Sequence, residues 1–389
     1  MEKKSISAIL KKNAMLIVLV LVYLFFLILT KGGIFKPSSF TELINQNAYV
    51  YILGSGMLMC MLTGGNIDLS CGAFVCLLGA LGGVFMIVQG LSTGVSILLL
   101  LLIGVVYGVG LGFLIAYVHI PPWIATLAGF LSFRGLGTSI LSANSKTGSL
   151  APFPLSFQNL FYGRVFPSEK GVFNWPCFLF GLLMAAIVVL VIFTTRKNRL
   201  AKDYEADSIK AAALKSGLGA AVIILVMTRL ALDGGIPTTL LWVAGIVLIY
   251  SFITSKTTIG RHFYVVGGNM EAARLSGVNT RRIMFLAYLN MAILTAIATF
   301  TVVARSQSAY ADVGKNFEMD AISACVVGGV SASGGAGTVL GMVIGATLIG
   351  VINLGMSLIS LDANYQRVVK GFVLLAAVVF DILSKQKQK

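Results

Sequence analysis

Long apolar segments recur along the chain and are separated by short polar stretches. A helix needs roughly 20 apolar residues, within a range of about 17–25, to cross the hydrocarbon core of a bilayer. The pattern predicts an all-α fold, a polytopic transmembrane helical bundle of about 10–12 spans with broken or re-entrant helices. We expect it to form a single domain over residues 1–389. The expected spans are 14–31, 44–62, 70–88, 94–118, 122–142, 174–195, 217–232, 236–254, 284–304, 319–333, 336–356 and 364–384.

The composition agrees with a membrane protein and excludes other classes. Only 11% of the 389 residues are charged, against about 25% in soluble domains. The net charge of +15 would favour nucleic-acid binding in a polar protein, but here polar residues are too few to form such a surface. Five scattered cysteines without a CxxC pair, together with two histidines, predict neither a metal centre nor a disulfide framework.

Basic residues are distributed unevenly between the loops. The N-terminus, residues 196–215, residues 255–283 and the C-terminal tail hold 4, 6, 5 and 3 of the 29 Lys and Arg residues. Positive charge accumulates on the cytoplasmic side of membrane proteins, so both termini and both basic loops are expected in the cytoplasm. Residues 196–215 mix charges and predict a solvated cytoplasmic linker, and the apolar residues 217–254 predict a peripheral helical hairpin.

A polar break, TGGNIDLS, lies between two apolar runs. An ionisable group within the hydrocarbon layer costs at least roughly 2.5–3.5 kcal/mol, so Asp68 requires an explanation. Irregular backbone at membrane depth is stable only when it is buried in protein or lines a wet cavity. Asn66 and Asp68 therefore either line a pathway, or form a short loop in which Asp68 caps the following helix.

Three further charged residues fall at the edges of apolar runs. Glu318 and Asp320 stand at the expected external start of a short helix, where carboxylates interact well with the helix dipole. Arg134 either pairs with a carboxylate of another helix or extends to the nearer interface. Glycines four residues apart, as at Gly341 and Gly345, predict close helix packing.

The cytoplasmic segment 257–283 contains a short predicted helix. Asn269 is a good N-cap and Gly277 suits the left-handed position after the helix. Glu271 lies near the positive end and Arg274 near the negative end, as the dipole prefers. A helix of two turns is marginal in water and needs a surface to pack on. It is therefore either an interfacial helix on the membrane or a docking element for a cytoplasmic partner.

These segments resemble a known family. YVVGGNMEAARLSGVNTRRI, MDAISACVVGGVSASGGAGTVLGMVIGATLIGVINLGMSLI and NYQRVVKGFVLLAAVVFD resemble permease subunits of bacterial ABC sugar importers, in the branch of ribose, galactose, xylose and multiple-monosaccharide permeases. TGGNIDLSCGA resembles the GGxDLSxGS stretch of that family, with Ile67 in place of its usual glycine and an additional Asn66. The extra hairpin 217–254 is similar to the longer xylose or multiple-monosaccharide subgroup.

The resemblance implies a function and a set of partners. The chain would be a permease that moves a monosaccharide such as xylose, galactose, arabinose or ribose by alternating access, in the cytoplasmic (inner) membrane of a bacterium. A second permease subunit, most simply a second copy in a homodimer, would complete the pore within the membrane lipid, and an extracytoplasmic sugar-binding protein would deliver the sugar. A cytoplasmic ATP-binding subunit would hold ATP and Mg, since this chain has no GxxxxGK[ST] motif. The chain itself would be no enzyme and would bind no cofactor or metal.

The resemblance also implies roles for individual residues. Residues 257–283 would be the coupling loop, and pathway residues would be polar groups that suit hydroxyl-rich sugars. A secondary transporter would instead place ion-coupling carboxylates near the midplane, and an intramembrane enzyme would need a nucleophile or metal cluster. The candidates are Asn66, Asp68, Arg134 and Asn47 for the pathway, Glu318 and Asp320 for gating or binding-protein docking, and Asn269, Glu271, Ala272, Ala273, Arg274 and Gly277 for ATPase coupling.

Overall fold

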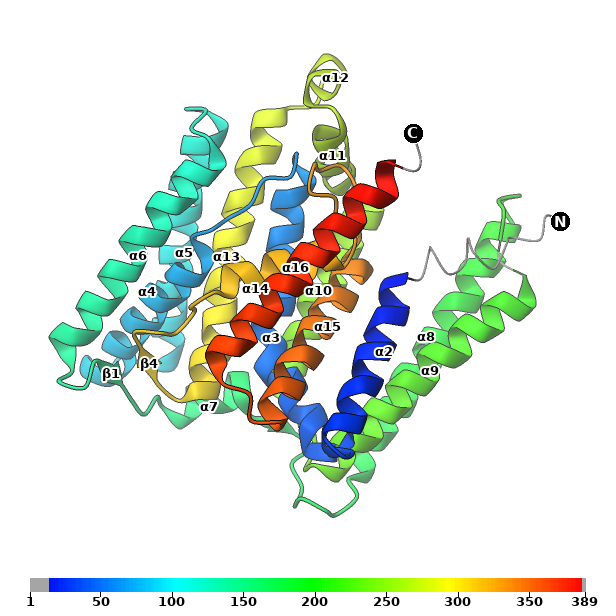
Figure 1. Cartoon of the computed structure of the whole chain (residues 1–389), viewed down its shortest axis with the longest axis horizontal. Coiled ribbons are helices and arrows are strands. Elements are labelled where there is room, and N and C mark those ends of the chain that lie inside the picture. The colour runs from blue at the N-terminus through cyan, green and yellow to red at the C-terminus, as the bar shows by residue number, and fades with distance from the viewer. Residues whose placement is uncertain (1–13, 207, 387–389) are drawn as a thin grey trace.

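The computed structural model describes residues 14–206 and 208–386. These residues form a bundle of helices that run roughly side by side, joined by short loops (Figure 1). The first half contains α2 (Ala14–Leu29), η1 (Gly33–Phe35), α3 (Pro37–Leu62), α4 (Cys71–Gly83), the π-helical η2 (Val84–Val88), α5 (Thr93–Ala116), α6 (Pro122–Asn144), α7 (Leu155–Tyr162) and α8 (Trp175–Leu200). The second half contains α9 (Ile209–Leu232), α10 (Thr238–Lys256), α11 (Thr258–Gly268), α12 (Met270–Leu275), α13 (Thr280–Ser306), α14 (Phe317–Val327), α15 (Val339–Leu358) and α16 (Ala363–Gln386).

The expected class, an all-α multi-pass membrane protein, is confirmed. Each of the twelve expected spans overlaps a helix, and within the described residues eight helices are long and apolar enough to cross a bilayer. The expected span 319–333 is instead the 11-residue helix α14. At 1.5 Å per residue it covers about 16 Å, roughly half of the hydrocarbon core. It is therefore a half-length helix, followed by an irregular glycine-rich turn.

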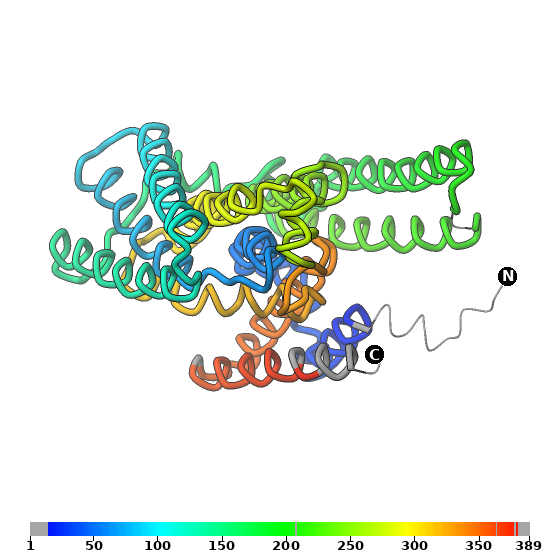
Figure 2. The backbone as a smooth tube through the Cα atoms, turned by 90° about the horizontal axis from the view of Figure 1, so that it is seen from above, coloured from blue at the N-terminus to red at the C-terminus, as the bar shows by residue number. Residues whose placement is uncertain are grey.

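Helix α3 occupies the centre of the bundle (Figure 2). It contacts α10, α13, α14 and α15, and its residues from Ala48 to Leu62 are almost all buried. The largest fully buried side chains include several from this helix, among them Leu53, Met57 and Leu58. A central helix buried on all sides cannot face lipid, which explains why α3 tolerates polar residues such as Asn45 and Asn47.

The region 196–254 differs from the expectation. Helix α9 packs along α8 and the two extend away from the bundle, whereas α10 packs against α3 (Figure 2). The peripheral pair is thus α8–α9 rather than the two spans of 217–254. The expected linker 196–215 is mostly helical, and only residues 201–208 connect α8 to α9. Helix α8 continues through its basic end because Lys197 and Arg199 in its last turn interact well with the helix dipole.

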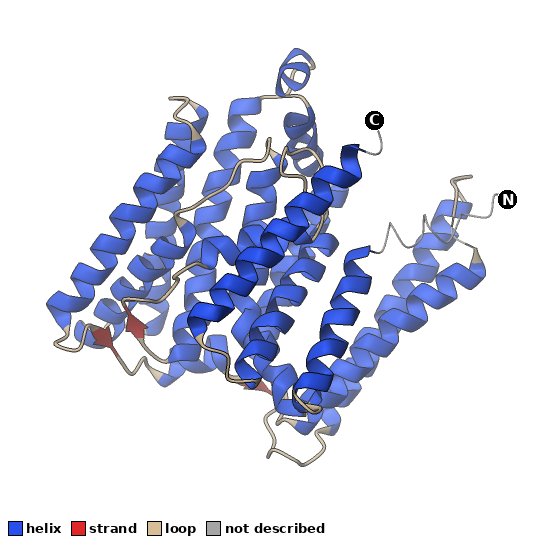
Figure 3. Ribbon diagram, in the orientation of Figure 1, coloured by secondary structure: helices blue, strands red, loops and turns tan. Residues whose placement is uncertain are grey.

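Short strands lie at the lower end of the bundle in Figure 3, opposite α12, and the described residues contain four of them. Strand β1 (Ser149–Leu150) pairs antiparallel with β4 (Ala309–Tyr310), and β2 (Arg164–Val165) pairs antiparallel with β3 (Ile236–Pro237). Phe157 and Phe161 of α7 are buried beneath this region. These pairs connect the 145–173 loop to later parts of the chain and close that end of the bundle.

Candidate functional site

The break between α3 and α4 is an irregular, half-buried segment, in which Thr63, Asp68 and Ser70 are buried and Gly64 is exposed. Gly64 and Gly65 have φ angles of +112° and +75°, in the region that glycine adopts without steric cost. A Cβ atom on Gly65 would collide with the carbonyl of Ala332. The break therefore packs backbone against backbone on the turn between α14 and α15.

The turn between α14 and α15 contacts both the break and the end of α11. Gly335 donates its N–H to the carbonyl of Leu62 over 3.2 Å. A Cβ on Gly334 would collide with the backbone of Gly64, and one on Gly267 would collide with Leu62. We call residues 62–65, 267–268 and 332–335 the glycine junction. It brings both irregular segments into direct contact with the chain that leads into α12.

Asp68 orders the start of α4. Its side chain is buried, and Oδ1 accepts hydrogen bonds from the N–H of Ser70 at 2.8 Å and its hydroxyl at 2.6 Å. The Ser70 hydroxyl also lies 2.7 Å from the hydroxyl of Tyr107 on α5. The N-cap residue of α4 is Ser70 rather than Asp68, so Asp68 does not cap the helix itself but holds the residue that precedes its first turn.

The two asparagines expected on the pathway make contacts within the chain. Half-buried Asn66 donates from Nδ2 to the carbonyl of Thr63 over 3.0 Å. Asn47 is buried and donates from Nδ2 to the carbonyl of Ala346 over 2.7 Å, which connects α3 to α15. Asn66 thus stays at the break, whereas Asn47 lies in the packed interface of two helices.

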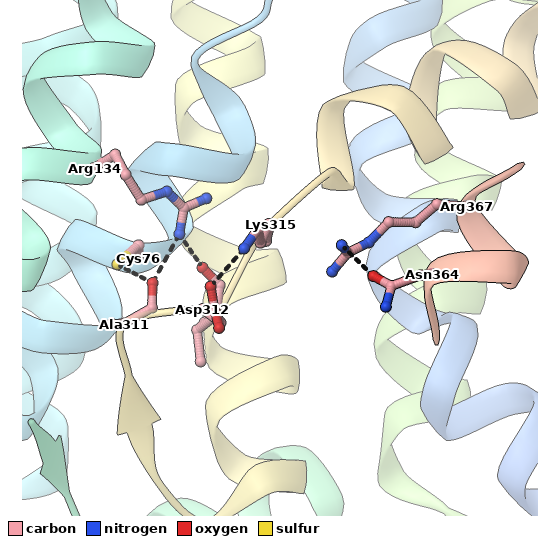
Figure 4. Close-up of polar contacts among 8 residues, drawn as sticks. Cys76, Arg134, Ala311, Asp312, Lys315, Asn364 and Arg367 are labelled. Carbon is pink, nitrogen blue, oxygen red and sulfur yellow. Dashed lines mark hydrogen bonds and ion pairs between the residues drawn. The ribbon is translucent and has the colours of Figure 1, made fainter. Parts of the chain in front are cut away.

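Arg134 of α6 binds backbone carbonyls (Figure 4). Its Nη1 donates to Ala311 over 3.0 Å and to Val313 over 2.8 Å. These partners are carbonyls rather than the expected carboxylate, and the alternative that the side chain extends to the interface stays a prediction. The segment before α14 is irregular, so its carbonyls lack helical partners and accept from the guanidinium instead. Arg134 thereby fixes the approach to α14.

Glu318 and Asp320 lie inside the bundle, each with 3% of its surface exposed. Asp320 accepts two hydrogen bonds from Lys370 of α16, at 2.9 and 3.0 Å, and one from the hydroxyl of Tyr49 at 2.5 Å. The carboxylate of Glu318 lies against Gly72 in the first turn of α4. Both carboxylates are thus held inside the chain, and the expected roles in gating or in binding-protein docking stay predictions.

The ion pair partner of Asp320 was not among the expected site residues. A lysine within an apolar run needs a carboxylate partner or an interface, and Lys370 lies within the expected span 364–384. The need of a membrane-embedded lysine for a partner was therefore the sequence signal that pointed to Lys370. It does not select Asp320 over other acidic residues, because 50 residues of chain and the fold of α14–α16 separate the two.

The short helix α12 forms as expected and lies beyond the end of the bundle (Figure 1). Asn269 caps it, its Oδ1 accepting from the N–H of Ala272 over 2.9 Å, and Gly277 follows it with a φ of +82°. Arg274 donates to Glu271 over 2.6 Å. This hydrogen bond and the Coulomb attraction behind it raise the pKa of the Arg274 side chain above its ordinary value.

One side of α12 is anchored and the other is open. Ala273 is fully buried, while the flanking Met270 and Leu275 are 45% and 78% exposed. Beside them a cavity of about 380 Å³ lies between α11 and the start of α13, with His262 and Leu286 in its wall. Neither Met270 nor Leu275 lines this cavity. Leu275 lies two residues after Ala273 and therefore on nearly the opposite side of the helix, away from the anchored side.

Comparison with known proteins identifies the family. The family model described as the branched-chain amino acid transport system / permease component matches residues 39–378. The chain is 32% identical to the xylose transport system permease protein of Haemophilus influenzae, over 96% of each chain. It is 30% identical to that of Escherichia coli K12, over 96% of this chain and 92% of the relative. It is also 31% identical to the ribose import permease protein of Bacillus subtilis, over 89% and 85%.

Comparison with solved structures found no match. The family description names amino acids, while these relatives are named for xylose and ribose, so the family description alone does not name the solute of this chain. The match covers most of the chain, including the break, α12 and the α14–α16 region. The chain therefore belongs to this family of transport-system permease components, together with the xylose and ribose permeases.

Proposed function

We propose that this chain is the permease subunit of an ABC importer that moves xylose or a related monosaccharide into a bacterial cell. The observation that carries the proposal is its identity of 32% and 30% to two xylose permeases over almost the whole of both chains. Galactose, arabinose and ribose remain the alternative substrates, ribose with direct support from the ribose permease relative. An extracytoplasmic sugar-binding protein delivers the sugar.

The energy comes from a partner. A cytoplasmic ATP-binding subunit holds ATP and Mg, and it contacts the permease at α12 through the residues from Asn269 to Gly277. Support comes from Leu275, which is exposed on the side of α12 away from the buried Ala273, and from the cavity that Ser276 and Gly277 line directly after it. The buried Ala273 makes the helix a rigid attachment rather than a loose loop. Both termini and this surface lie on the cytoplasmic side of the inner membrane.

Alternating access follows from how α12 is attached. The glycine junction has no side chains between its three backbone segments, so a displacement of α12 reaches residues 64–65 and 334–335 without a compressible layer in between. Packed elements of this kind switch between discrete arrangements rather than deform continuously. Closure of the ATPases thus moves the two breaks together, and Asp320 with Lys370 acts as the gate that holds α14 to α16.

The sugar crosses between two permease subunits, most simply two copies of this chain. Asn66 is the favoured pathway residue because it is half-buried at the break. Asp68, Arg134 and Asn47 shape the walls of that pathway through contacts within the chain. In this arrangement polar backbone and amide groups, rather than free charges, face a neutral solute.

The test is uptake of radiolabelled xylose by proteoliposomes that contain this chain, its ATP-binding subunit and its binding protein. We expect xylose uptake only when ATP is enclosed in the proteoliposomes together with the ATP-binding subunit. Leu275→Asp places a charge on the exposed side of α12 and is expected to reduce the rate of this uptake at least tenfold. Leu200→Asp is the matched control, because Leu200 is exposed at the polar end of α8, away from α12.

Two results would contradict the proposal. Uptake driven by an ion gradient in vesicles that hold this chain alone would make it a secondary transporter. ATP-driven uptake that Leu275→Asp leaves unchanged, at equal abundance of the variant, would remove α12 as the site of coupling.

A further inference from the structure

A cavity of about 210 Å³ lies between the end of α8 and the start of α9. Arg196 and Arg199 of α8 line it on one side and Lys215 of α9 lines it on the other. Helix α8 begins near the β2–β3 pair and runs toward the end of the molecule that carries α12, so the cavity lies toward the α12 end (Figure 1). It is smaller than the roughly 300–1,000 Å³ of sites that enclose a whole small molecule. It therefore suits one group of a larger ligand.

Positive charge predominates around this cavity. Its wall, as far as the structure describes it, contains three basic side chains and no acidic one. Residues 196–215 as a whole hold six Lys and Arg against three Asp and Glu, so three positive charges remain in excess even when every acidic residue pairs with a basic one. Arg196 and Lys215 also interact within the chain, and the excess of three already allows for such pairs. The negative end of α8 and the positive end of α9 both border the cavity and offset each other, so the side chains make it a site that attracts anions.

Apolar side chains are exposed on both helices directly next to the cavity. On α8, Leu190 and Val191 precede the basic residues and are 62% and 56% exposed, and Val191 also lines the cavity. On α9, Leu218 and Val222 follow the basic residue and are each 62% exposed. Both helices are long and apolar enough to cross a bilayer, so these side chains face hydrocarbon. The cavity thus lies at the level where the hydrocarbon ends and the lipid headgroups begin.

The combination of basic and apolar walls selects among anions. Arginine donates hydrogen bonds to phosphate oxygens in a fixed, planar fork. A phospholipid uses both walls, because its phosphate reaches the basic residues while its acyl chains lie along the exposed apolar side chains. A free anion would use only the basic residues. Among phospholipids, those with a net negative headgroup match the excess positive charge, whereas a zwitterionic headgroup brings a cation of its own.

We propose that this cavity binds the phosphate headgroup of an anionic phospholipid in the leaflet on the α12 side of the membrane. That this leaflet is the cytoplasmic one rests on the proposed function, whereas the binding itself does not depend on transport. The apolar cluster that joins the α8–α9 pair to the bundle, with Cys177, Leu230 and Ile44, lies at the other end of the pair. The headgroup is therefore a second point of attachment, at the end of the pair far from the bundle contact.

The test is native mass spectrometry of the full-length chain in detergent micelles, titrated with dioleoyl phosphatidylglycerol or with zwitterionic dioleoyl phosphatidylcholine. We expect phosphatidylglycerol to bind saturably and about tenfold or more tighter than phosphatidylcholine, since the acyl chains are the same and the headgroup charge differs. The triple variant Arg196→Gln, Arg199→Gln and Lys215→Gln removes the three charges that line the cavity. It is expected to weaken phosphatidylglycerol binding about tenfold or more.

A second triple variant is the matched control. Lys197→Gln, Lys202→Gln and Lys210→Gln remove the same charge from the same segment, at exposed positions that do not line the cavity. Charges away from the cavity are screened by solvent and salt, so the control is expected to weaken phosphatidylglycerol binding by less than about threefold. Equal midpoints of thermal unfolding, measured without added phospholipid, establish that both variants are folded. The comparison of the two lipids uses the unaltered chain and needs no variant.

Four results would overturn the inference. Equal weakening by the two triple variants would show attraction to the basic segment in general rather than to the cavity. Equal affinities for the two lipids would remove the headgroup charge as the feature recognised, and inorganic phosphate that binds as tightly as phosphatidylglycerol would make the occupant a free anion. If the cavity variant keeps its lipid affinity but no longer co-purifies with the ATP-binding subunit, the occupant is an acidic protein surface.

Failure of the proposed function gives a different result. If the complete importer moves no monosaccharide, the proposed function fails, but the lipid titration is unaffected because it uses this chain alone. If the importer transports with ATP while phosphatidylglycerol shows no preference for the cavity, the proposed function stands and the lipid site does not.

Discussion

Helices α15 and α8 are both long and apolar, yet one is inside the protein and the other is at its edge. In the apolar stretch of α15, 72% of the residues are buried, whereas in α8, which is the more apolar of the two, 17% are buried. Apolarity therefore does not determine burial. In lipid there is no hydrophobic drive between helices, and close packing of small residues decides which helices associate.

The glycines show why the two helices differ. Gly341 and Gly345 of α15 lie so close to α14 that a Cβ on either would collide with the backbone of Gly328 or Ala324. Helix α8 has one such glycine, Gly181, which meets only the side chain of Met227 on α9. Close backbone contact thus holds the centre of the bundle together, while the α8–α9 pair has side-chain contact. The difference predicts that the same kind of substitution has unequal effects in the two regions.

The largest effect is expected at the ion pair that joins the buried Asp320 of α14 to Lys370 of α16. Lys370→Met leaves the buried Asp320 carboxylate without its cation, and breaking a buried pair in this way costs about 3–5 kcal/mol. Reversible unfolding in mixed micelles with SDS measures the free energy of unfolding. Asp320→Asn in the same chain removes the uncompensated charge and is expected to restore part of the loss.

The control for this prediction is an exposed pair of the same type. Lys315 lies 3.0 Å from Asp312, and both side chains are largely exposed, as Figure 4 shows beside Arg134. Lys315→Met is expected to change the free energy of unfolding by less than about 1 kcal/mol. Equal losses for Lys315→Met and Lys370→Met would show that burial does not set the strength of these pairs.

Sequence reasoning located most of the fold for a simple physical reason. A membrane span must be a long apolar helix, so the apolar runs of the sequence mark the helices, and every expected span overlaps one. The residues Asn269 and Gly277 likewise marked the two ends of α12 correctly. Sequence reasoning did not predict which helices pack together, because by composition α9 could pack on α10 as well as on α8. Which helix packs where depends on the fit of small residues across long sequence separations, as at Gly181 and Met227.

The site was predictable to a lesser extent. The cost of a charge in the membrane drew attention to Asp68, Arg134 and Asp320, and all three make specific contacts. Their partners were not foreseeable, since Arg134 binds carbonyls that are free only because residues 311–316 are irregular in three dimensions. The cost identifies a residue that needs a partner, and the fold supplies the partner.

An intermediate effect is expected at the glycine junction. Gly65→Ala places a side chain at a φ of +75° and against the carbonyl of Ala332. The backbone strain alone costs about 1–3 kcal/mol, so the midpoint of thermal unfolding and the amount of folded protein in the membrane should both fall. Gly217→Ala in α9 is the matched control, because open space surrounds that glycine and alanine favours a helix by up to about 1 kcal/mol. Equal destabilisation by both variants would remove close backbone contact as the reason that the centre is rigid.

The smallest effects are expected within the peripheral pair, and they are expected to differ between its two ends. Asn174 caps α8 beside the bundle, where it is buried, accepts from the N–H of Cys177 over 3.1 Å and donates to Ser168 over 3.0 Å. Ser208 caps α9 at the exposed far end with one bond, from the N–H of Ala211 over 3.2 Å. Loss of a cap costs about 0.5–2 kcal/mol. Asn174→Ala should lie at the upper limit and Ser208→Ala at the lower limit, in the same SDS unfolding measurement. If Ser208→Ala were the more destabilising of the two, the far end rather than the bundle end would hold the pair together, and the contrast between an ordered centre and a loosely attached edge would be wrong for α8 and α9.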